Sequence, residues 1–211
     1  MSTRPRLPRI WIITDPAHPD GPVAPVMRAL RGCAPGMAGV QLRARHVPDR
    51  QLVSWGRELR RVTHDRDCLL TINRRADVAE IVGADGVHLP ERALSVEEIR
   101  YGWPDMPLIG VSRHDRQGLA RAERDEATYA FLSPVFAVPE KNEPMGIEGF
   151  EAAIAHVGIP TYALGGISSG DTGALLRAGA FGVAVRRAVY GSDEPADAIR
   201  RFIEVFEESM R

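Results

Sequence analysis

Short apolar segments alternate with amphipathic segments along the whole sequence, and this alternation limits the folds that the chain can adopt. The apolar segments are bounded by turn residues and predict buried strands at 10–14, 40–43, 69–72, 86–89, 108–111, 129–132, 161–167 and 182–185. Helical patterns follow them at 23–30, 49–63, 77–82, 96–101, 117–124, 150–156, 169–178 and 196–208. Repeated strand–helix units form parallel sheets. About eight short units favour a closed (β/α)8 TIM barrel over an open doubly wound sheet.

Length and composition predict one domain in a reducing compartment. The 211 residues show no shift in composition, so we expect a single barrel over residues 1–211 with an N-terminal tail at 1–9. Asp15 interrupts the apolar run after the basic tail, which argues against a signal peptide, and no segment is typical of a membrane span. Cys33 and Cys68 match no metal or redox motif. We therefore expect a cytoplasmic protein with free thiols.

The ends of the last two predicted strands indicate a phosphate-binding site. Gly165 and Gly166 end the seventh strand just before a helix, and Arg186 and Arg187 follow the eighth. Glycine lets backbone N–H groups approach an anion closely, and a helix N-terminus adds partial positive charge. In a (β/α)8 barrel, phosphate sites often lie after strands seven and eight.

Polar and cationic residues also follow the other predicted strands. The carboxyl ends of barrel strands converge on one face, so we expect these side chains to lie together. The net charge of −1 gives no reason to expect a nucleic-acid partner, whereas cations gathered at one rim favour a small phosphorylated substrate. The alternative is a set of solvated rim arginines. The candidates are Gln41, Arg43, Arg45, Asn73, Ser112, His114 and, in the irregular 133–149 loop, Lys141.

Several of these residues lie in stretches that resemble the thiamine phosphate synthase and thiazole tautomerase superfamily. The resemblance runs in order from about residue 10 to residue 190. It rests on QLRAR (41–45), TIN (71–73), GADGVHL (83–89), GVS with His114, SPVF (133–136) with Lys141 and GIEG (146–149), and ALGGI (163–167). It implies a (β/α)8 barrel that binds thiazole phosphate near Gly165, Gly166, Arg186 and Arg187. It also implies that a pyrimidine pyrophosphate would lie near Gln41, Arg43, Arg45, Asn73 and Lys141.

The sequence departs from the synthases of this superfamily at the magnesium site. Two aspartates hold the metal in synthases, and their positions here are Arg74 and Ala93. Glu91 is a nearby carboxylate that could substitute, but a solvated glutamate at a helix start is the simpler interpretation. We therefore predict no metal ligands and no cofactor, with Mg²⁺ required only if the chain is a synthase.

These departures favour a tautomerase-like isomerase as the leading hypothesis. His114 resembles the histidine proposed to move protons in thiazole tautomerases, and histidine can take both protonation states near neutral pH. Gln41 and Ser112 would orient the substrate, and Pro90 resembles that branch. Synthases often carry a histidine at this position too, so His114 is equally a structural candidate. The alternatives are a divergent thiamine phosphate synthase, a transferase that releases pyrophosphate, and a non-catalytic phosphate binder. A homo-oligomer is compatible with the sequence, which does not fix the oligomeric state.

Overall fold

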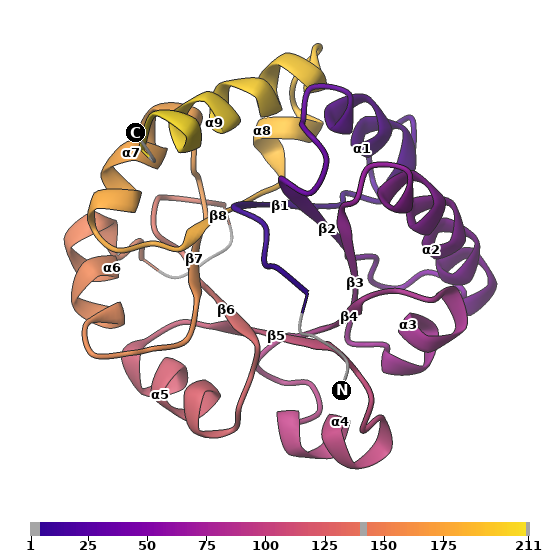
Figure 1. The fold of residues 1–211 in the computed structure, drawn as a ribbon, viewed down its shortest axis with the longest axis horizontal. Coiled ribbons are helices and arrows are strands. Elements are labelled where there is room, and N and C mark those ends of the chain that lie inside the picture. Colours follow the sequence, from indigo (N-terminus) through magenta and orange to yellow (C-terminus); the bar gives the residue numbers. More distant parts are fainter. Residues whose placement is uncertain (1–4, 140–142, 210–211) are drawn as a thin grey trace.

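Eight parallel strands form a closed barrel in sequence order, which confirms the predicted TIM barrel (Figure 1). The computed structural model describes residues 5–139 and 143–209. Strand β8 pairs with β1 and closes the barrel. The strands are β1 Ile10–Ile13, β2 Ala38–Leu42, β3 Leu69–Asn73, β4 Gly86–Leu89, β5 Leu108–Arg113, β6 Tyr129–Leu132, β7 Thr161–Leu164 and β8 Gly182–Val185.

The helices form a ring around the barrel and cover its outer face (Figure 1). Aliphatic side chains from the strands and the inner faces of the helices form one continuous buried core between the two layers. The helices are α1 Val23–Leu30, α2 Asp49–His64, α3 Ala76–Val82, α4 Val96–Gly102, α5 Arg116–Arg124, α6 Gly146–Ile154, α7 Ser169–Arg177, α8 Arg187–Tyr190 and α9 Pro195–Ser209. In the described part of the chain, no helix combines the length and the apolar character that crossing a membrane requires.

Two helices differ from the sequence-based expectation. Helix α6 begins at Gly146 and ends at Ile154, whereas the sequence predicted 150–156. Backbone N–H groups of Met145 and Gly146 donate to the carbonyls of Pro134 and Val135, so contacts with the preceding loop start the helix early. Helix α8 was not predicted, because a four-residue helix is too short to show a helical period.

Aromatic side chains fill the inside of the barrel toward its N-terminal end. Trp11 stacks on Tyr129 with ring centroids 5.0 Å apart, and Phe131 and Tyr162 contact Trp11 edge-on. Part of the predicted tail closes this end, since the hydroxyl of Tyr162 donates to the carbonyl of Pro8 at 2.5 Å. Ligands therefore have to approach the interior from the opposite end of the barrel.

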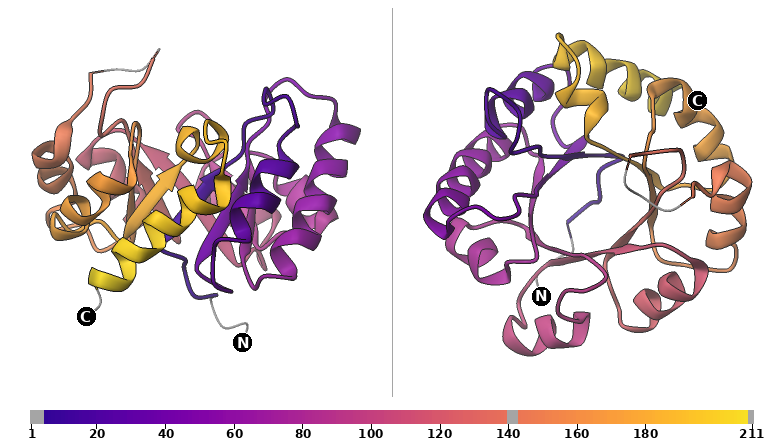
Figure 2. Two further views of the ribbon diagram at one scale, coloured as in Figure 1. Left: turned by 90° about the horizontal axis from the view of Figure 1, so that it is seen from above. Right: turned by 180° about the vertical axis from the view of Figure 1, so that it is seen from behind.

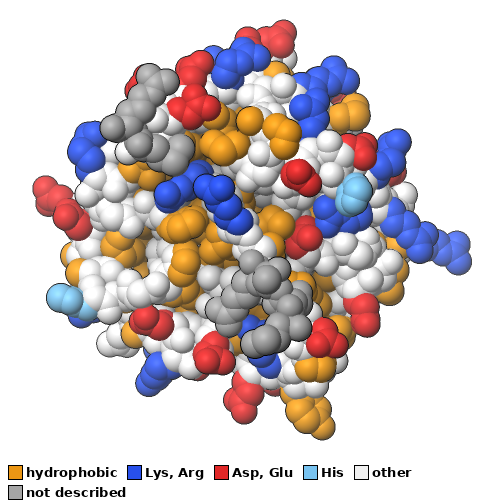
Figure 3. Space-filling model, viewed as in Figure 1, with side chains coloured by type: hydrophobic (Ala, Val, Ile, Leu, Met, Phe, Trp, Pro, Cys, Tyr) orange, Lys and Arg blue, Asp and Glu red, His pale blue; other side chains and the backbone are white. Residues whose placement is uncertain are grey.

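The two ends of the barrel differ in what they carry. Both termini lie on one side, and the connection between β6 and α6 projects from the other (Figure 2). Apolar side chains surround the centre of the N-terminal face (Figure 3). The carboxyl ends of the strands and the long loop thus share the face on which the sequence placed its candidate site.

The two cysteines are buried free thiols, as expected. Burial raises the pKa of the Cys33 thiol to about 12, and it also raises the pKa of Cys68. Since the thiolate is the reactive form of cysteine, neither thiol is available for chemistry near neutral pH.

Candidate active site

A pocket of about 700 Å³ lies at the carboxyl ends of β2, β3, β4 and β5. It brings together three residues that the sequence singled out, Arg45, Asn73 and His114. The pocket is basic, because its described lining holds several cations and one carboxylate. Its charged and polar lining is Arg45, His46, Asn73, Arg74, Arg75, Glu91, Arg92 and His114.

One of the pocket arginines is already neutralised. Arg75 pairs with Asp49 at 2.5 Å and with Asp77 at 2.7 Å. The hydrogen bonds to Asp77 and then to Asp49 raise the pKa of the Arg75 guanidinium above its ordinary value. Arg75 therefore ties α3 to α2. By contrast, within the described residues no ion pair joins Arg45, Arg74 or Arg92 to a carboxylate.

Asn73 and Gln41 form a buried amide pair at the floor of this region. Gln41 Nε2 donates to Asn73 Oδ1 at 3.2 Å. Asn73 Oδ1 thereby accepts one hydrogen bond, and the Nδ2 group of Asn73 can donate to a ligand. Gln41 Oε1 is buried and accepts no hydrogen bond from the described residues. A buried acceptor without a partner costs about 1–3 kcal/mol, so a ligand that donates to Gln41 would be favoured.

His114 has a fixed tautomer when it is neutral. Its Nδ1 lies 2.6 Å from the carbonyl oxygen of Ser133, and a carbonyl can only accept, so Nδ1 carries a proton. In the neutral ring, Nε2 is then the unprotonated nitrogen. Nε2 lies 3.7 Å from Glu91 Oε2. The two side chains are 37% and 47% exposed, so both are open to a ligand.

His88 lies inside the barrel and forms hydrogen bonds there. Its Nδ1 is 3.2 Å from the hydroxyl of Tyr129, and its Nε2 is 2.8 Å from Ser112 Oγ. Burial, with smaller contributions from Arg113 and Arg43, lowers the pKa of His88 to about 3. His88 is therefore neutral at physiological pH. Ser112, which we expected to orient substrate, is held by this histidine.

The turn at the two glycines of the predicted phosphate site packs against the loop after β6. Both have positive φ, 110° at Gly165 and 67° at Gly166. A Cβ at Gly165 would lie 3.0 Å from Pro134 Cα, and one at Gly166 would lie 2.9 Å from Phe136 Cβ. Because Phe136 N donates to the Gly165 carbonyl at 3.0 Å, the turn and the loop after β6 form one packed unit.

The backbone at this turn keeps donors available for an anion. The N–H groups of Gly166 and Ile167 donate to no acceptor among residues 5–139 and 143–209. The N-terminus of α7 contributes less than expected. Asp171 accepts from the N–H of Ser168 at 2.8 Å and from its hydroxyl at 2.6 Å, so part of the positive helix end is already compensated.

The remaining predicted cations lie beside this turn, since β7 pairs with β8 and β8 with β1. Arg186 and Arg187 are exposed, and Arg186 Nε is 3.8 Å from Asp15 Oδ2. Burial, followed by the charges of Arg45 and Arg186, lowers the pKa of Arg43. The positive charges of Arg45 and Arg186 therefore both act on Arg43. Lys141 lies outside the described residues.

Sequence reasoning missed several partners in this site. The pairing of Glu91 with His114, the hydroxyl of Tyr129 under His88 and the ion pair of Asp15 with Arg186 join residues that lie far apart in the sequence. The positions of Asp15 and Glu91 after the first and fourth strands indicate that both belong to this rim, but position alone does not give their partners.

The closed barrel places the chain in the class of (β/α)8 TIM-barrel proteins, and comparison with known proteins identifies its family. Residues 10–189 match the family model described as thiamine monophosphate synthase. A putative thiamine-phosphate synthase of Geobacter sulfurreducens is 37% identical over 199 residues, 92% of each chain. A thiamine-phosphate synthase of Moorella thermoacetica is 36% identical and covers 86% of this chain and 88% of its own.

A solved structure agrees with the sequence matches. Thiamine phosphate pyrophosphorylase from Pyrococcus furiosus superposes with a TM-score of 0.88 at 30% identity, covering 96% of this chain and 97% of its own. The chain belongs to the thiamine monophosphate synthase family, as its motifs indicated. Membership of this family indicates that the protein is an enzyme of thiamine biosynthesis.

The residues present do not fit the magnesium ion that this family implies. Mg²⁺ prefers oxygen ligands in an octahedron. Arg74 lines the pocket next to Asn73, whose oxygen is engaged by Gln41, and the position expected for the second aspartate is Ala93. In the described part of the chain, no group of three or more His, Cys, Asp or Glu side chains is placed to hold a metal. Among the described residues that line the pocket, Glu91 alone supplies carboxylate oxygens.

Proposed function

We propose that this chain is a transferase that joins a pyrimidine pyrophosphate to a thiazole phosphate and releases pyrophosphate. The support comes from the relatives, which are named thiamine-phosphate synthases and match along nearly the whole chain. This reaction was the first alternative from the sequence, and the relatives favour it over the tautomerase hypothesis. The proposed partners are therefore two small phosphorylated molecules.

The observation that carries the proposal is the presence of two cationic regions on one rim. Arg45, Arg74 and Arg92 lie in the pocket over β2 to β4, where they would hold the pyrophosphate and stabilise the charge that develops as it leaves. Arg186 and Arg187, with the free N–H groups at Gly166 and Ile167, would hold the thiazole phosphate.

Other rim residues take orienting roles in this proposal. Gln41 Oε1 would accept a hydrogen bond from the pyrimidine, since it is buried and unpartnered. Asn73 Nδ2 and Arg43 would contact ligand oxygens between the two cationic regions. Ser112 would act through His88, and Lys141 would contribute from the loop after β6.

A second candidate, proton transfer of the tautomerase type, has one specific observation in its favour. His114 donates from Nδ1 to Ser133, which leaves Nε2 as a base beside Glu91 at the pocket. A group in this state can take a proton from one ligand atom and return it to another. Such a reaction needs no pyrophosphate and no metal.

One assay separates these candidates from a non-catalytic binder. The purified protein is incubated with both phosphorylated substrates, and thiamine phosphate and released pyrophosphate are measured. We expect equal amounts of the two products. Proton NMR of the thiazole phosphate tautomer in deuterated water is recorded in parallel. Isomerisation without thiamine phosphate would favour the tautomerase, and ligand binding without either reaction would favour the binder.

A further inference from the structure

We infer that the pocket over β2 to β4 binds a diphosphate directly on guanidinium groups, without a divalent cation, and that Arg74 takes the place of the metal. This inference deepens the proposed function and rests on it for the choice of diphosphate. The ligand class follows from the pocket itself, which offers Arg45, Arg74 and Arg92 to an anion and a single carboxylate, Glu91, to a cation.

The charge balance of the pocket supports an anion that carries several negative charges. Arg75 is left out of the balance, because its charge is taken up by Asp49 and Asp77, two carboxylates that do not line the pocket. Arg45, Arg74 and Arg92 have no such partner among the described residues, and Glu91 is the one carboxylate among the described residues that line the pocket. Like charges that share one pocket repel each other, and a bound polyanion would relieve this repulsion.

The backbone conformation and a backbone hydrogen bond fix the position of Arg74 on the barrel rim. Its φ is 67°, in the left-handed region, and its N–H donates to the carbonyl of His88 at 2.9 Å. Arg74 therefore leaves the barrel rim between β3 and β4, one residue after the buried Asn73. A guanidinium at this point supplies fixed positive charge and several N–H donors, which suit phosphate oxygens.

The neighbouring polar groups favour the same ligand. Asn73 offers Nδ2 because Gln41 engages its oxygen, and an amide N–H donates to phosphate but does not ligate Mg²⁺. Glu91 lies 3.7 Å from His114 Nε2, so the two side chains occupy the same part of the pocket. Among the described pocket residues near Arg74, hydrogen-bond donors and cations therefore outnumber the groups that could ligate a metal.

The direct test is titration of the whole protein with inorganic pyrophosphate by calorimetry, first in EDTA and then with excess Mg²⁺. We expect pyrophosphate to bind in EDTA. Binding should be equal or weaker with Mg²⁺, because the metal reduces the negative charge of pyrophosphate and Arg74 repels the metal. An affinity that rises tenfold or more with Mg²⁺, or no binding in EDTA, would overturn the inference.

A pair of variants assigns the effect to Arg74. Asparagine and aspartate both tolerate the left-handed backbone, so Arg74→Asn and Arg74→Asp keep the local fold. Both should weaken pyrophosphate binding in EDTA by about 10- to 100-fold, which is typical for the loss of a charge-assisted hydrogen bond. Only Arg74→Asp adds a metal ligand, so only its affinity should recover with Mg²⁺.

Arg201→Asp is the matched control, because Arg201 is exposed on α9 and away from the pocket. It makes the same change of charge and should bind like the parent. Unchanged binding by Arg74→Asn in EDTA would contradict the inference. Thiamine phosphate formation that requires Mg²⁺ would also overturn it while leaving the proposed function intact. Metal-free pyrophosphate binding without catalysis would instead count against the function alone.

Discussion

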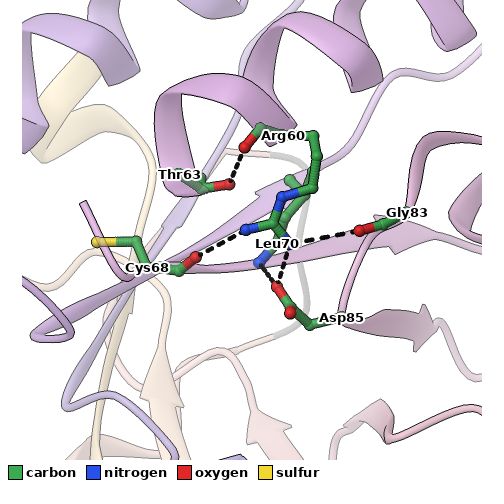
Figure 4. Close-up of polar contacts among 6 residues, drawn as sticks. All are labelled: Arg60, Thr63, Cys68, Leu70, Gly83 and Asp85. Carbon is green, nitrogen blue, oxygen red and sulfur yellow. Dashed lines mark hydrogen bonds and ion pairs between the residues drawn. The ribbon is translucent and has the colours of Figure 1, made fainter. Parts of the chain in front are cut away.

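Arg60 Nη1 lies 2.7 Å from Asp85 Oδ2, and this ion pair joins α2 to the turn before β4 (Figure 4). The same oxygen of Asp85 accepts from the backbone N–H of Leu70 at 2.7 Å. Arg60 also donates to the carbonyls of Cys68 and Gly83, each at 3.4 Å. Asp85 belongs to the GADGVHL motif, so this part of the motif joins α2, β3 and β4.

Asp85→Ala should therefore destabilise the barrel without acting on the pocket. The variant leaves the half-buried guanidinium of Arg60 and the N–H of Leu70 without their acceptor, which we expect to cost about 1–3 kcal/mol. Urea unfolding measures the change. Asp105→Ala removes an exposed carboxylate that forms no ion pair within the described residues and should change stability little. Equal stability of the two variants would contradict the role given to Asp85.

Gly166→Ala should weaken phosphate binding through the loop after β6. The new Cβ would lie 2.9 Å from Phe136 Cβ and 3.0 Å from the carbonyl oxygen of Ala137, at a backbone φ of 67°. A strained left-handed residue typically costs about 1–3 kcal/mol. Calorimetry with inorganic phosphate and thermal unfolding would both detect the displaced loop.

Gly170→Ala is the control for this variant. Its Cβ would have no neighbour nearer than Ser168 Oγ at 3.7 Å, and Gly170 lies in α7, where alanine is favoured by about 1 kcal/mol. It should keep phosphate affinity and match or exceed the parent in stability. If both glycine variants behave alike, the contacts of Gly166 with the loop have no role in binding.

The fold was predictable because each strand and each helix carries its own local pattern. The eight buried strands are short apolar runs, and parallel order follows from the helices between them. The start of α6 was not predictable, since it depends on hydrogen bonds from Met145 and Gly146 to the loop after β6. Hydrogen bonds to residues outside a helix can set where the helix begins, and such bonds leave no periodic pattern in its sequence.

The candidate site was predictable only in part, for a similar reason. Strand ends identified Arg45, Asn73 and His114, which the structure brings to one pocket. The neutralisation of Arg75 by Asp49 and the tautomer of His114 depend on side chains that meet across strands. Position along the chain tells which rim a residue belongs to, but not which of its atoms is already engaged.

Buried His88 should make stability depend on pH. Its pKa is about 3 in the folded protein and near the ordinary histidine value of 6.5 in the unfolded chain, so below pH 6.5 the unfolded chain binds a proton that the folded chain does not. Stability should therefore fall as the pH drops from about 6.5 toward 3, by up to about 1.4 kcal/mol per pH unit. Urea unfolding at several pH values gives the slope.

Comparison with His88→Gln isolates this contribution. Glutamine can still hydrogen-bond with Ser112 but cannot titrate, so its stability should change less steeply over the same range. His156→Gln, which removes an exposed histidine with a positive φ, should retain the parent slope. Parallel curves for the parent and His88→Gln would show that His88 does not resist protonation in the folded state.

His114 provides the test of proton chemistry at the pocket. Its Nδ1 proton is held by the carbonyl of Ser133, and Nε2 is the free base 3.7 Å from Glu91. His114→Asn should lower any isomerisation or deuterium uptake of the thiazole phosphate by about 10²–10⁴-fold, the usual contribution of a general acid–base group. Binding of inorganic pyrophosphate should stay within a few-fold, because Arg45, Arg74 and Arg92 are unchanged. Glu91→Gln should have a smaller effect on exchange than His114→Asn, since Glu91 would only hold the protonated ring. If His114→Asn exchanges label as fast as the parent, the histidine only anchors the loop at Ser133, and a measurable loss of thermal stability would then be its one consequence.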